Sequence, residues 1–174
     1  FDRKPVMLSA LAGVALFAQL VVDLRLLGWM PENGDPMLMP VLLANAAGFF
    51  LSIGVGVVAI MSMIGDVVDE NEMLTGKREE GLYYSARAFF AKAAYSFGHF
   101  FAGVSLDIFV HLPFEAVPGQ LDDGVLFRLG IAAGPVMSIT AIISLLAYSR
   151  YKLNRERHQE VLAALEARRP VPSE

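Results

Sequence analysis

Most of the charged residues of this chain lie in a few blocks, and the long apolar stretches between the blocks are nearly free of charge. The blocks lie at residues 2–4, 66–80, 122–128 and 150–169. Only 18% of the 174 residues are charged and 55% are hydrophobic, with a mean hydropathy of +0.51. A water-soluble domain carries about 25% charged residues. The pattern predicts an all-α integral membrane protein, because charge must leave the hydrocarbon each time the chain turns around.

Four segments reach the length of a membrane-spanning helix, which needs roughly 20 apolar residues. These segments are residues 5–27, 37–64, 82–111 and 126–148. Together they predict a transmembrane bundle over residues 1–153. Residues 154–174 follow as an amphipathic tail, whose helix we expect to lie on the membrane surface with Val161, Leu162 and Leu165 on one face.

Two of the spans carry further local signals. The Gly134-Pro135 pair predicts a kink in the fourth span. The second span has a face of small residues, which favours close packing against another helix in lipid. This face consists of Gly48, Ser52, Gly54 and Gly56.

The positions of Lys and Arg predict the orientation of the spans. One side of the membrane would hold Arg3, Lys4, Lys77, Arg78, Arg150, Lys152, Arg155 and Arg157. The other side would hold only Arg25 and Arg128. By the positive-inside rule, we expect both termini and the segment 65–81 to be cytoplasmic in a multi-pass protein of the cell (inner or plasma) membrane.

Several classes of protein find no support in the sequence. The chain has no cysteine, so a disulfide framework and a thiolate metal site are excluded. Asp107 and His111 are too weak a pair to predict a metal site, and no arrangement of residues predicts hydrolysis, a phosphate loop or nucleic-acid binding. We expect no enzyme and no cofactor. We expect no secretory signal peptide in this sequence, and because the chain begins with Phe1 we expect a fragment or a processed product.

Lys92 is the strongest candidate for a functional residue. It lies about ten residues into the third span, roughly 15 Å deep and close to the bilayer midplane. A lysine at that depth costs at least ~2.5 kcal/mol and calls for a partner. No acidic residue lies in the centre of any span, so we expect the partner outside this chain. The alternative is a lysine that packs against backbone carbonyls or extends to the interface.

Other polar residues share a helix face with Lys92. Ser85, Ser96, His99 and Gly103 are spaced from it by multiples of a helical turn, and Tyr95 lies at the edge of the face. The stripe indicates either the wall of an aqueous path or an ordinary seam between helices. For His99 alone, a packing role is favoured. Lys92, Tyr95, Ser96 and His99, with Asn45 of the second span, form the predicted substrate cavity.

The segment 66–80 also has two interpretations. It is either a solvated hairpin whose charges only fix topology, or a cytoplasmic gate whose ion pairs exist in one conformation and break in another. The predicted gate residues are Asp66, Asp69, Glu72, Lys77, Arg78 and Arg87, with Glu70 beside them.

The sequence resembles a known family over roughly residues 40–155. Three motifs carry most of this resemblance. They are Gly65-Asp66-Val67-Val68-Asp69-Glu70-Asn71-Glu72, Thr75-Gly76-Lys77-Arg78-Glu79-Glu80-Gly81-Leu82-Tyr83-Tyr84-Ser85 and Phe89-Phe90-Ala91-Lys92. The chain is similar in them to the glycoside–pentoside–hexuronide:cation symporters, which are melibiose-permease-like members of the major facilitator superfamily. The ending Tyr148-Ser149-Arg150-Tyr151-Lys152-Leu153-Asn154 is similar to the end of the family's last helix.

The resemblance implies a twelve-helix fold of which these spans are the last four. It places Lys92 on the family's helix-eleven lysine, near the sugar and cation sites. The coupling cation, Na⁺ or H⁺, would bind mainly outside this chain, in an N-terminal half that the chain lacks. The expected partners are a small-molecule substrate such as a sugar or glycoside, membrane lipid and that missing half.

The sequence therefore predicts the C-terminal part of a secondary active transporter, a sugar or glycoside:cation symporter that works by alternating access. Two alternatives stay open. One is a self-contained four-helix membrane anchor or assembly subunit. The other is a transporter of the same superfamily with a lipid-like or other non-sugar substrate.

Overall fold

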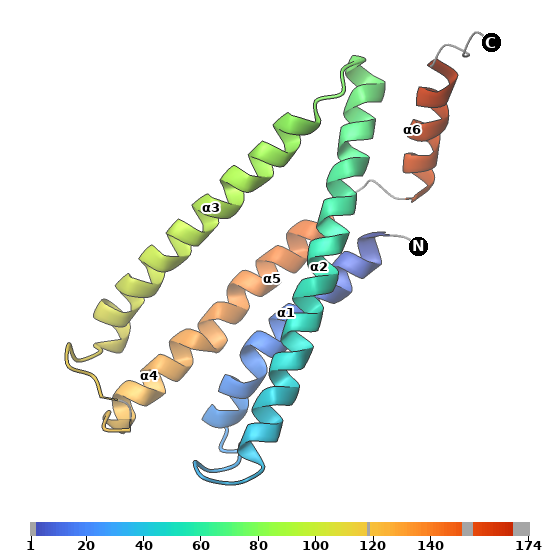
Figure 1. The fold of residues 1–174 in the computed structure, drawn as a ribbon. Coiled ribbons are helices and arrows are strands. Elements are labelled where there is room, and N and C mark those ends of the chain that lie inside the picture. The colour runs from blue at the N-terminus through green and yellow to red at the C-terminus, as the bar shows by residue number, and fades with distance from the viewer. Residues whose placement is uncertain (1–2, 118, 151–154, 169–174) are drawn as a thin grey trace.

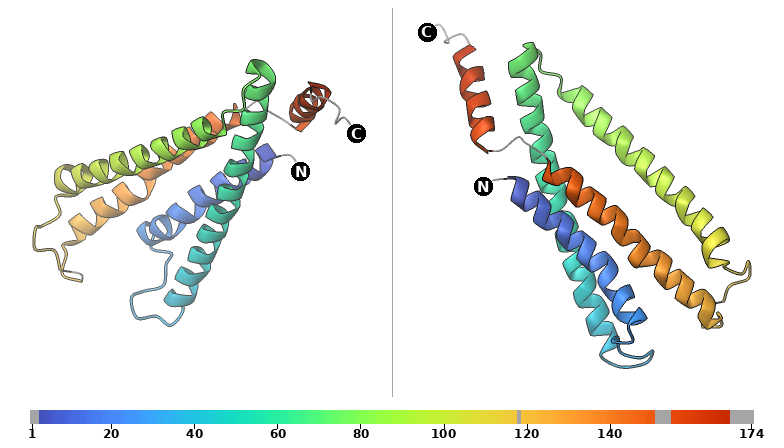
Figure 2. Two further views of the ribbon diagram at one scale, coloured as in Figure 1. Left: turned by 45° about the horizontal axis from the view of Figure 1, so that its top comes forward. Right: turned by 180° about the vertical axis from the view of Figure 1, so that it is seen from behind.

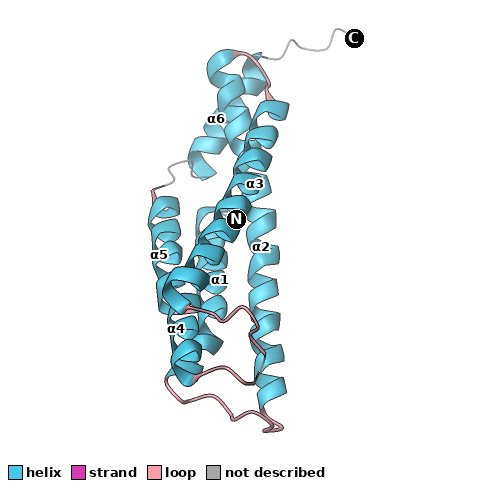
Figure 3. Ribbon diagram, turned by 90° about the vertical axis from the view of Figure 1, so that its left-hand side faces the viewer, coloured by secondary structure: helices cyan, strands magenta, loops and turns pink. Residues whose placement is uncertain are grey.

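The computed structural model describes residues 3–117, 119–150 and 155–168, and within these residues every regular element is a helix (Figures 1 and 3). The elements are α1 (Arg3–Leu26), α2 (Leu38–Thr75), α3 (Glu80–Val104), the π-helix η1 (Ser105–Val110), α4 (Asp123–Ala133), α5 (Pro135–Ser149) and α6 (Arg155–Arg168). The predicted all-α fold is confirmed.

Four helical stretches are long and apolar enough to cross a membrane. They are Arg3–Leu26, Leu38–Thr75, Glu80–Val110 and Asp123–Ser149. Each contains most of one predicted span. The four membrane helices expected from hydropathy are therefore present, and their ends differ from the predicted ends by a few residues except at the end of α2.

The end of α2 corrects the predicted turn at residues 65–81. The helix continues through the charged residues to Thr75, and only Gly76–Glu79 form the connection to α3. A helix that leaves the hydrocarbon has no need to stop there, because water solvates its charged side chains. It ends at Gly76, whose left-handed φ of 72° suits glycine and whose N–H donates to the carbonyl of Glu72.

The predicted kink in the fourth span is confirmed. Gly134, with φ −99° and ψ −98°, separates α4 from α5, and Pro135 opens α5. With its amide nitrogen turned toward this break, Gln19 of α1 donates to the carbonyl oxygens of Gly134 (2.7 Å) and Ala133 (3.1 Å). A side chain of a neighbouring helix thus satisfies backbone groups at the break, as membrane helices require.

Helix α1 lies along α2 on one side and along α5 on the other (Figure 2). The small-residue face of α2 is largely the reason for the close α1–α2 approach. A Cβ at Gly48 would overlap the Phe17 ring, and Ser52 reaches the α-carbon of Gly13 so closely that a side chain there would not fit. Gly54, in contrast, has open space around it.

The small core lies where α1, α2 and the end of α5 meet. Met7, Ala59 and Met63 are buried together, and Tyr148 of α5 packs against them. Helix α3 has no buried residue, and it leaves large side chains such as Phe100 and Phe101 mostly exposed. The apolar surface of α3 is therefore available to lipid or to other protein segments.

The C-terminal helix forms as expected, and it packs against another helix of the protein. Helix α6 lies beside the charged end of α2 (Figures 1 and 2), and it buries Val161 completely and Leu165 to 9% exposure. Leu162, predicted on the same face, is 40% exposed. Val161 and Leu165 thus pack within the protein, and the expected position of this helix at a membrane surface stays a prediction.

Candidate transport site

Lys92 lies in the middle part of the third span. It follows Glu80, the first residue of α3, by roughly 18 Å of helix. Its side chain is exposed, and its carbonyl oxygen accepts a hydrogen bond from the hydroxyl of Ser96 at 3.1 Å. Lys92 forms no ion pair with any described residue. A partner for its charge outside this chain therefore stays a prediction.

Tyr95 and His99 are the two predicted cavity residues that the structure brings together. Nδ1 of His99 lies 2.7 Å from the carbonyl oxygen of Tyr95. Both side chains line a hollow of about 570 Å³ on α3, whose other lining residues are small: Ala91, Ala94, Gly98 and Ala102. The small residues create the groove between the two aromatic rings. Lys92 and Ser96 are not among the residues that line it.

Asn45 lies in the seam between α1 and α2. Its amide nitrogen donates to the carbonyl oxygen of Phe17 at 3.0 Å, and its buried Oδ1 has no hydrogen-bond partner among the described residues. This is the usual role of an isolated amide in a membrane helix, where it bonds across to a neighbour. The structure therefore pairs Asn45 with α1 and does not bring it to the polar stripe of α3.

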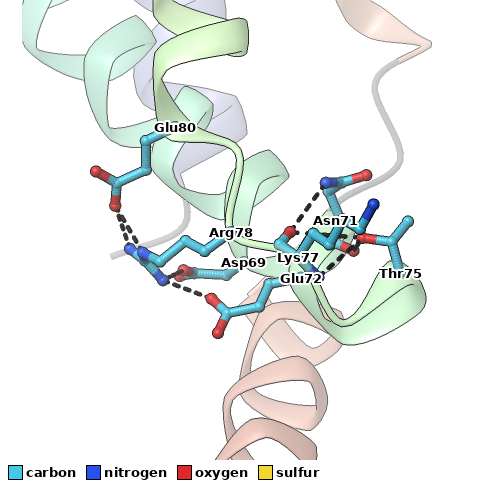
Figure 4. A network of polar contacts seen from close by, with 7 residues as sticks. All are labelled: Asp69, Asn71, Glu72, Thr75, Lys77, Arg78 and Glu80. Carbon is cyan, nitrogen blue, oxygen red and sulfur yellow. Dashed lines mark hydrogen bonds and ion pairs between the residues drawn. The ribbon is translucent and has the colours of Figure 1, made fainter.

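Arg78 joins the end of α2 to the start of α3 (Figure 4). Its guanidinium lies 3.0 Å from Oδ1 of Asp69 and 2.8 Å from Oε2 of Glu72, both on α2. Its Nε donates to Glu80 of α3 at 2.7 Å. The hydrogen bonds that Arg78 donates to Glu72, Glu80 and Asp69, in that order, raise its pKa above the ordinary value. Three of the carboxylates near the short connection thus share one cation.

The connection itself is held by a second set of hydrogen bonds (Figure 4). The Thr75 hydroxyl donates to the Asn71 carbonyl at 2.8 Å and accepts from the Lys77 N–H at 3.2 Å. The Asn71 amide donates to the Lys77 carbonyl at 3.4 Å. Lys77, a predicted gate residue, contributes its backbone, and its side chain forms no ion pair with any described residue.

Asp66 belongs to a different cluster. It is only 6% exposed, and it forms an ion pair with Arg3 at the start of α1. On its other side, Nε2 of His158 on α6 lies 3.4 Å from Oδ1 of Asp66. One turn further along α2, Glu70 lies 3.4 Å from Nε of Arg157. The hydrogen bonds that Arg157 donates to Glu160 and Glu70 raise its pKa above the ordinary value.

The predicted gate thus divides between two faces of α2. Asp66 and Glu70 are four residues apart and meet α1 and α6, whereas Asp69 and Glu72 are three residues apart and meet Arg78. Arg3, Arg157 and His158 were not among the predicted site residues. If the sequence analysis had continued the second helix to Thr75, helical spacing would have separated the two faces. No local signal in the sequence identifies α6 as the partner of Asp66 and Glu70.

Arg87, the last predicted gate residue, takes no part in either cluster. It lies in a hollow between α2, α3 and α5, and its buried Nε has no hydrogen-bond partner among the described residues. The sequence placed it near the acidic residues because it lies about one turn and a half into the predicted third span. In the folded chain, those acidic residues are engaged by Arg78, Arg3 and α6 instead.

Comparison with known proteins decides the class of this membrane bundle. A family model described as MFS/sugar transport protein matches residues 2–155, which is most of the chain. The chain belongs to this family. The predicted resemblance to sugar symporters of the major facilitator superfamily is therefore confirmed, and the four apolar helices are those of a multi-pass membrane protein in a family of transporters rather than enzymes.

A curated relative supports the same assignment. The chain is 30% identical over 145 residues to an uncharacterized symporter of Synechocystis sp.. The match covers 80% of this chain but 26% of the relative, so the chain spans about a quarter of that protein's length. No solved structure matches the chain.

Proposed function

We propose that this chain forms the last four membrane helices of a larger secondary transporter, a sugar or glycoside:cation symporter that works by alternating access. The description of the family, the name of the Synechocystis relative as a symporter and the share of that relative covered by the chain support the proposal. In this scheme the missing helices complete the substrate cavity and hold most of the site for Na⁺ or H⁺. Both termini lie in the cytoplasm by the distribution of Lys and Arg.

The single observation that carries the proposal is the Arg78 cluster at one end of the bundle. Asp69, Glu72 and Glu80 bind one guanidinium across the α2–α3 connection. All these groups are partly exposed, and exposed ion pairs are individually weak. A cluster of weak pairs suits an element that forms in one state of a transporter and opens in the other, because a small difference in free energy then shifts the populations.

Lys92 supplies the charge of the substrate cavity in this proposal. Its position in the middle part of the third span and its exposed side chain fit a lysine that faces a cavity completed by the other half of the transporter. Tyr95 and His99 border the same helix face, and aromatic and imidazole side chains are common in sites that bind sugars through stacking and hydrogen bonds. The cation itself binds mainly to carboxylates outside this chain.

Uptake by the full-length protein tests the proposal. Proteoliposomes would be given a panel of labelled sugars and glycosides, with and without a Na⁺ gradient and with and without a proton gradient. We expect accumulation of at least one sugar that depends on one of the two gradients. Lys92→Ala should abolish this accumulation, whereas Lys92→Arg, which keeps the charge, should retain part of it.

Two results would contradict the proposal. Unchanged uptake and unchanged cation dependence in Lys92→Ala would remove Lys92 from the cavity. Accumulation of a labelled lysophospholipid, with none of any sugar, would replace the substrate class while leaving the family intact.

A further inference from the structure

The hollow that contains Arg87 has a composition that the transport cycle does not explain. It measures about 550 Å³ and lies between the second half of α2, the start of α3 and the end of α5. Its polar lining consists of two arginines, Arg87 and Arg150, and two tyrosines, Tyr83 and Tyr148. The rest of the lining is apolar, as at Ile60 and Val67, and none of the lining residues is acidic. The hollow is therefore a cationic pocket with hydrocarbon walls.

The charge of this pocket is not neutralised within the described part of the chain. Nε of Arg87 is buried and has no hydrogen-bond partner there. Neither Arg87 nor Arg150 forms an ion pair with a described residue, since the nearby carboxylates are engaged by Arg3, Arg78 and Arg157. A guanidinium with a buried, unbonded nitrogen is unfavourable, and an anion that accepts its hydrogen bonds removes the penalty.

The place of the pocket indicates which anion fits. Arg150 directly follows the last residue of α5, and Tyr148 packs against the core cluster near the start of α1, so the pocket lies at the level where two spans begin and end. This is the level of lipid headgroups at a bilayer surface. Under the proposed orientation it is the cytoplasmic surface, where anionic lipids are enriched and where basic pockets between helices bind their headgroups.

We propose that this pocket binds an anionic phospholipid of the cytoplasmic leaflet. The two guanidiniums bind the phosphate, for which their planar donors are matched. The tyrosine hydroxyls are further donors for the headgroup, and the apolar walls of α2 and α5 cover the upper part of the acyl chains. The inference rests on the membrane location and orientation given above, but not on the nature of the transported substrate.

Native mass spectrometry of the full-length protein in detergent tests the inference. The protein would be titrated with phosphatidylglycerol, with phosphatidylethanolamine and with soluble glycerol 3-phosphate. We expect phosphatidylglycerol to be retained at the lowest concentration. The double variant Arg87→Gln with Arg150→Gln should bind it about tenfold or more weakly, which corresponds to the loss of one strong contact. Lys77→Gln is the matched control, because it removes an exposed cation near the same end of the bundle but outside the pocket.

A second variant and a second readout cover the case in which the double variant is unstable. Arg87→Lys with Arg150→Lys keeps both charges and should retain preferential binding of phosphatidylglycerol over phosphatidylethanolamine. Phosphatidylglycerol should also raise the melting temperature of the wild type more than phosphatidylethanolamine does. Neither measurement uses transport, so a failed uptake experiment leaves this result unaffected.

Three outcomes would overturn the inference. Equal retention of the two phospholipids by the wild type would show that charge does not select the lipid. Equal binding of glycerol 3-phosphate would show a site for soluble phosphate. A large loss of stability in the glutamine variant without any effect of added lipid would show that the arginines pair with acidic side chains elsewhere in the protein.

Discussion

Nε2 of His158 lies 3.4 Å from Oδ1 of Asp66, and this contact joins the C-terminal helix α6 to the far end of α2. The same oxygen of Asp66 pairs with Arg3 at the start of α1. Asp66 is 6% exposed, so this carboxylate stays largely out of water and depends on its two partners for compensation. One side chain thereby connects three helices that are far apart in the sequence.

Replacing Asp66 should release α6. In Asp66→Asn the charge that holds Arg3 and His158 is lost, at a cost of about 1–3 kcal/mol for a largely buried charged group. Spin labels at Leu74 of α2 and Gln159 of α6, both on exposed positions, report the distance between the helices. We expect the distance distribution to broaden in Asp66→Asn. Asp69→Asn is the control, since Asp69 lies on the other face of α2, and equal broadening in both variants would contradict the assignment.

The packing of α6 can be tested separately from its charges. Val161 is completely buried and Leu162 is 40% exposed, although they are neighbours in the sequence. Full burial of a valine is worth roughly 1.5–3 kcal/mol. Val161→Asp should therefore detach α6, as seen with the same pair of labels, while Leu162→Asp should leave it in place. If Leu162→Asp were the more disruptive change, α6 would bind through its other face, as a helix on a membrane surface would.

Arg78 should control the order of the α2–α3 connection. In Arg78→Ala the carboxylates of Asp69, Glu72 and Glu80 lose their shared cation, so the amides of residues 76–80 should exchange with deuterium faster. Lys77→Ala is the matched control and should exchange like the wild type. Equal exchange in both variants would show that the connection is held by the Thr75 and Asn71 hydrogen bonds alone.

The same connection should not open when the pH is raised. The pKa of Arg78 lies above its ordinary value because Glu72, Glu80 and Asp69 accept hydrogen bonds from its guanidinium. A cation whose pKa is raised by folding stabilises the folded form fully below its unfolded pKa, and this contribution is lost only as the pH passes the raised value. Hydrogen exchange of residues 76–80, corrected for the intrinsic rate, should therefore show no loss of protection due to Arg78 up to about pH 10.

Close packing of α1 against α2 predicts opposite effects at two glycines. Gly48→Ala would place a methyl group in the Phe17 ring, and such overpacking costs typically ~1–3 kcal/mol. Gly65→Ala meets no atom within 4 Å and should be neutral or stabilising, because alanine favours a helix over glycine by up to about 1 kcal/mol. Thermal unfolding of the full-length protein in detergent compares the two. Similar melting temperatures for both variants would contradict the observed seam.

Hydropathy and turn residues were sufficient to predict the four spans and the break at Gly134. The same signals misplaced the end of α2, because charge marks where a chain leaves the bilayer and not where its helix stops. The stop is encoded by Gly76, which lay inside the predicted turn. The acidic residues were recognised as a cluster. Their division between two faces of α2 becomes visible only when the helix is known to continue through them.

The partners of the candidate residues were harder to predict, since they depend on which helices meet. His158 and Arg157 lie in a tail whose composition indicates only an amphipathic helix, and their contacts with Asp66 and Glu70 depend on where α6 packs against α2. Asn45 was predicted to line the substrate cavity with the polar residues of α3, but it lies in the seam with α1. Its contact with the Phe17 carbonyl required knowledge of the neighbour.

The anchoring of Arg3 and His158 on one carboxylate has a mechanical consequence. The first and last described helices of the chain are fastened to the same point on α2, so a displacement of α2 must carry both of them together. A fluorescent tag placed beyond α6 would then report the movement of the bundle without touching any membrane helix.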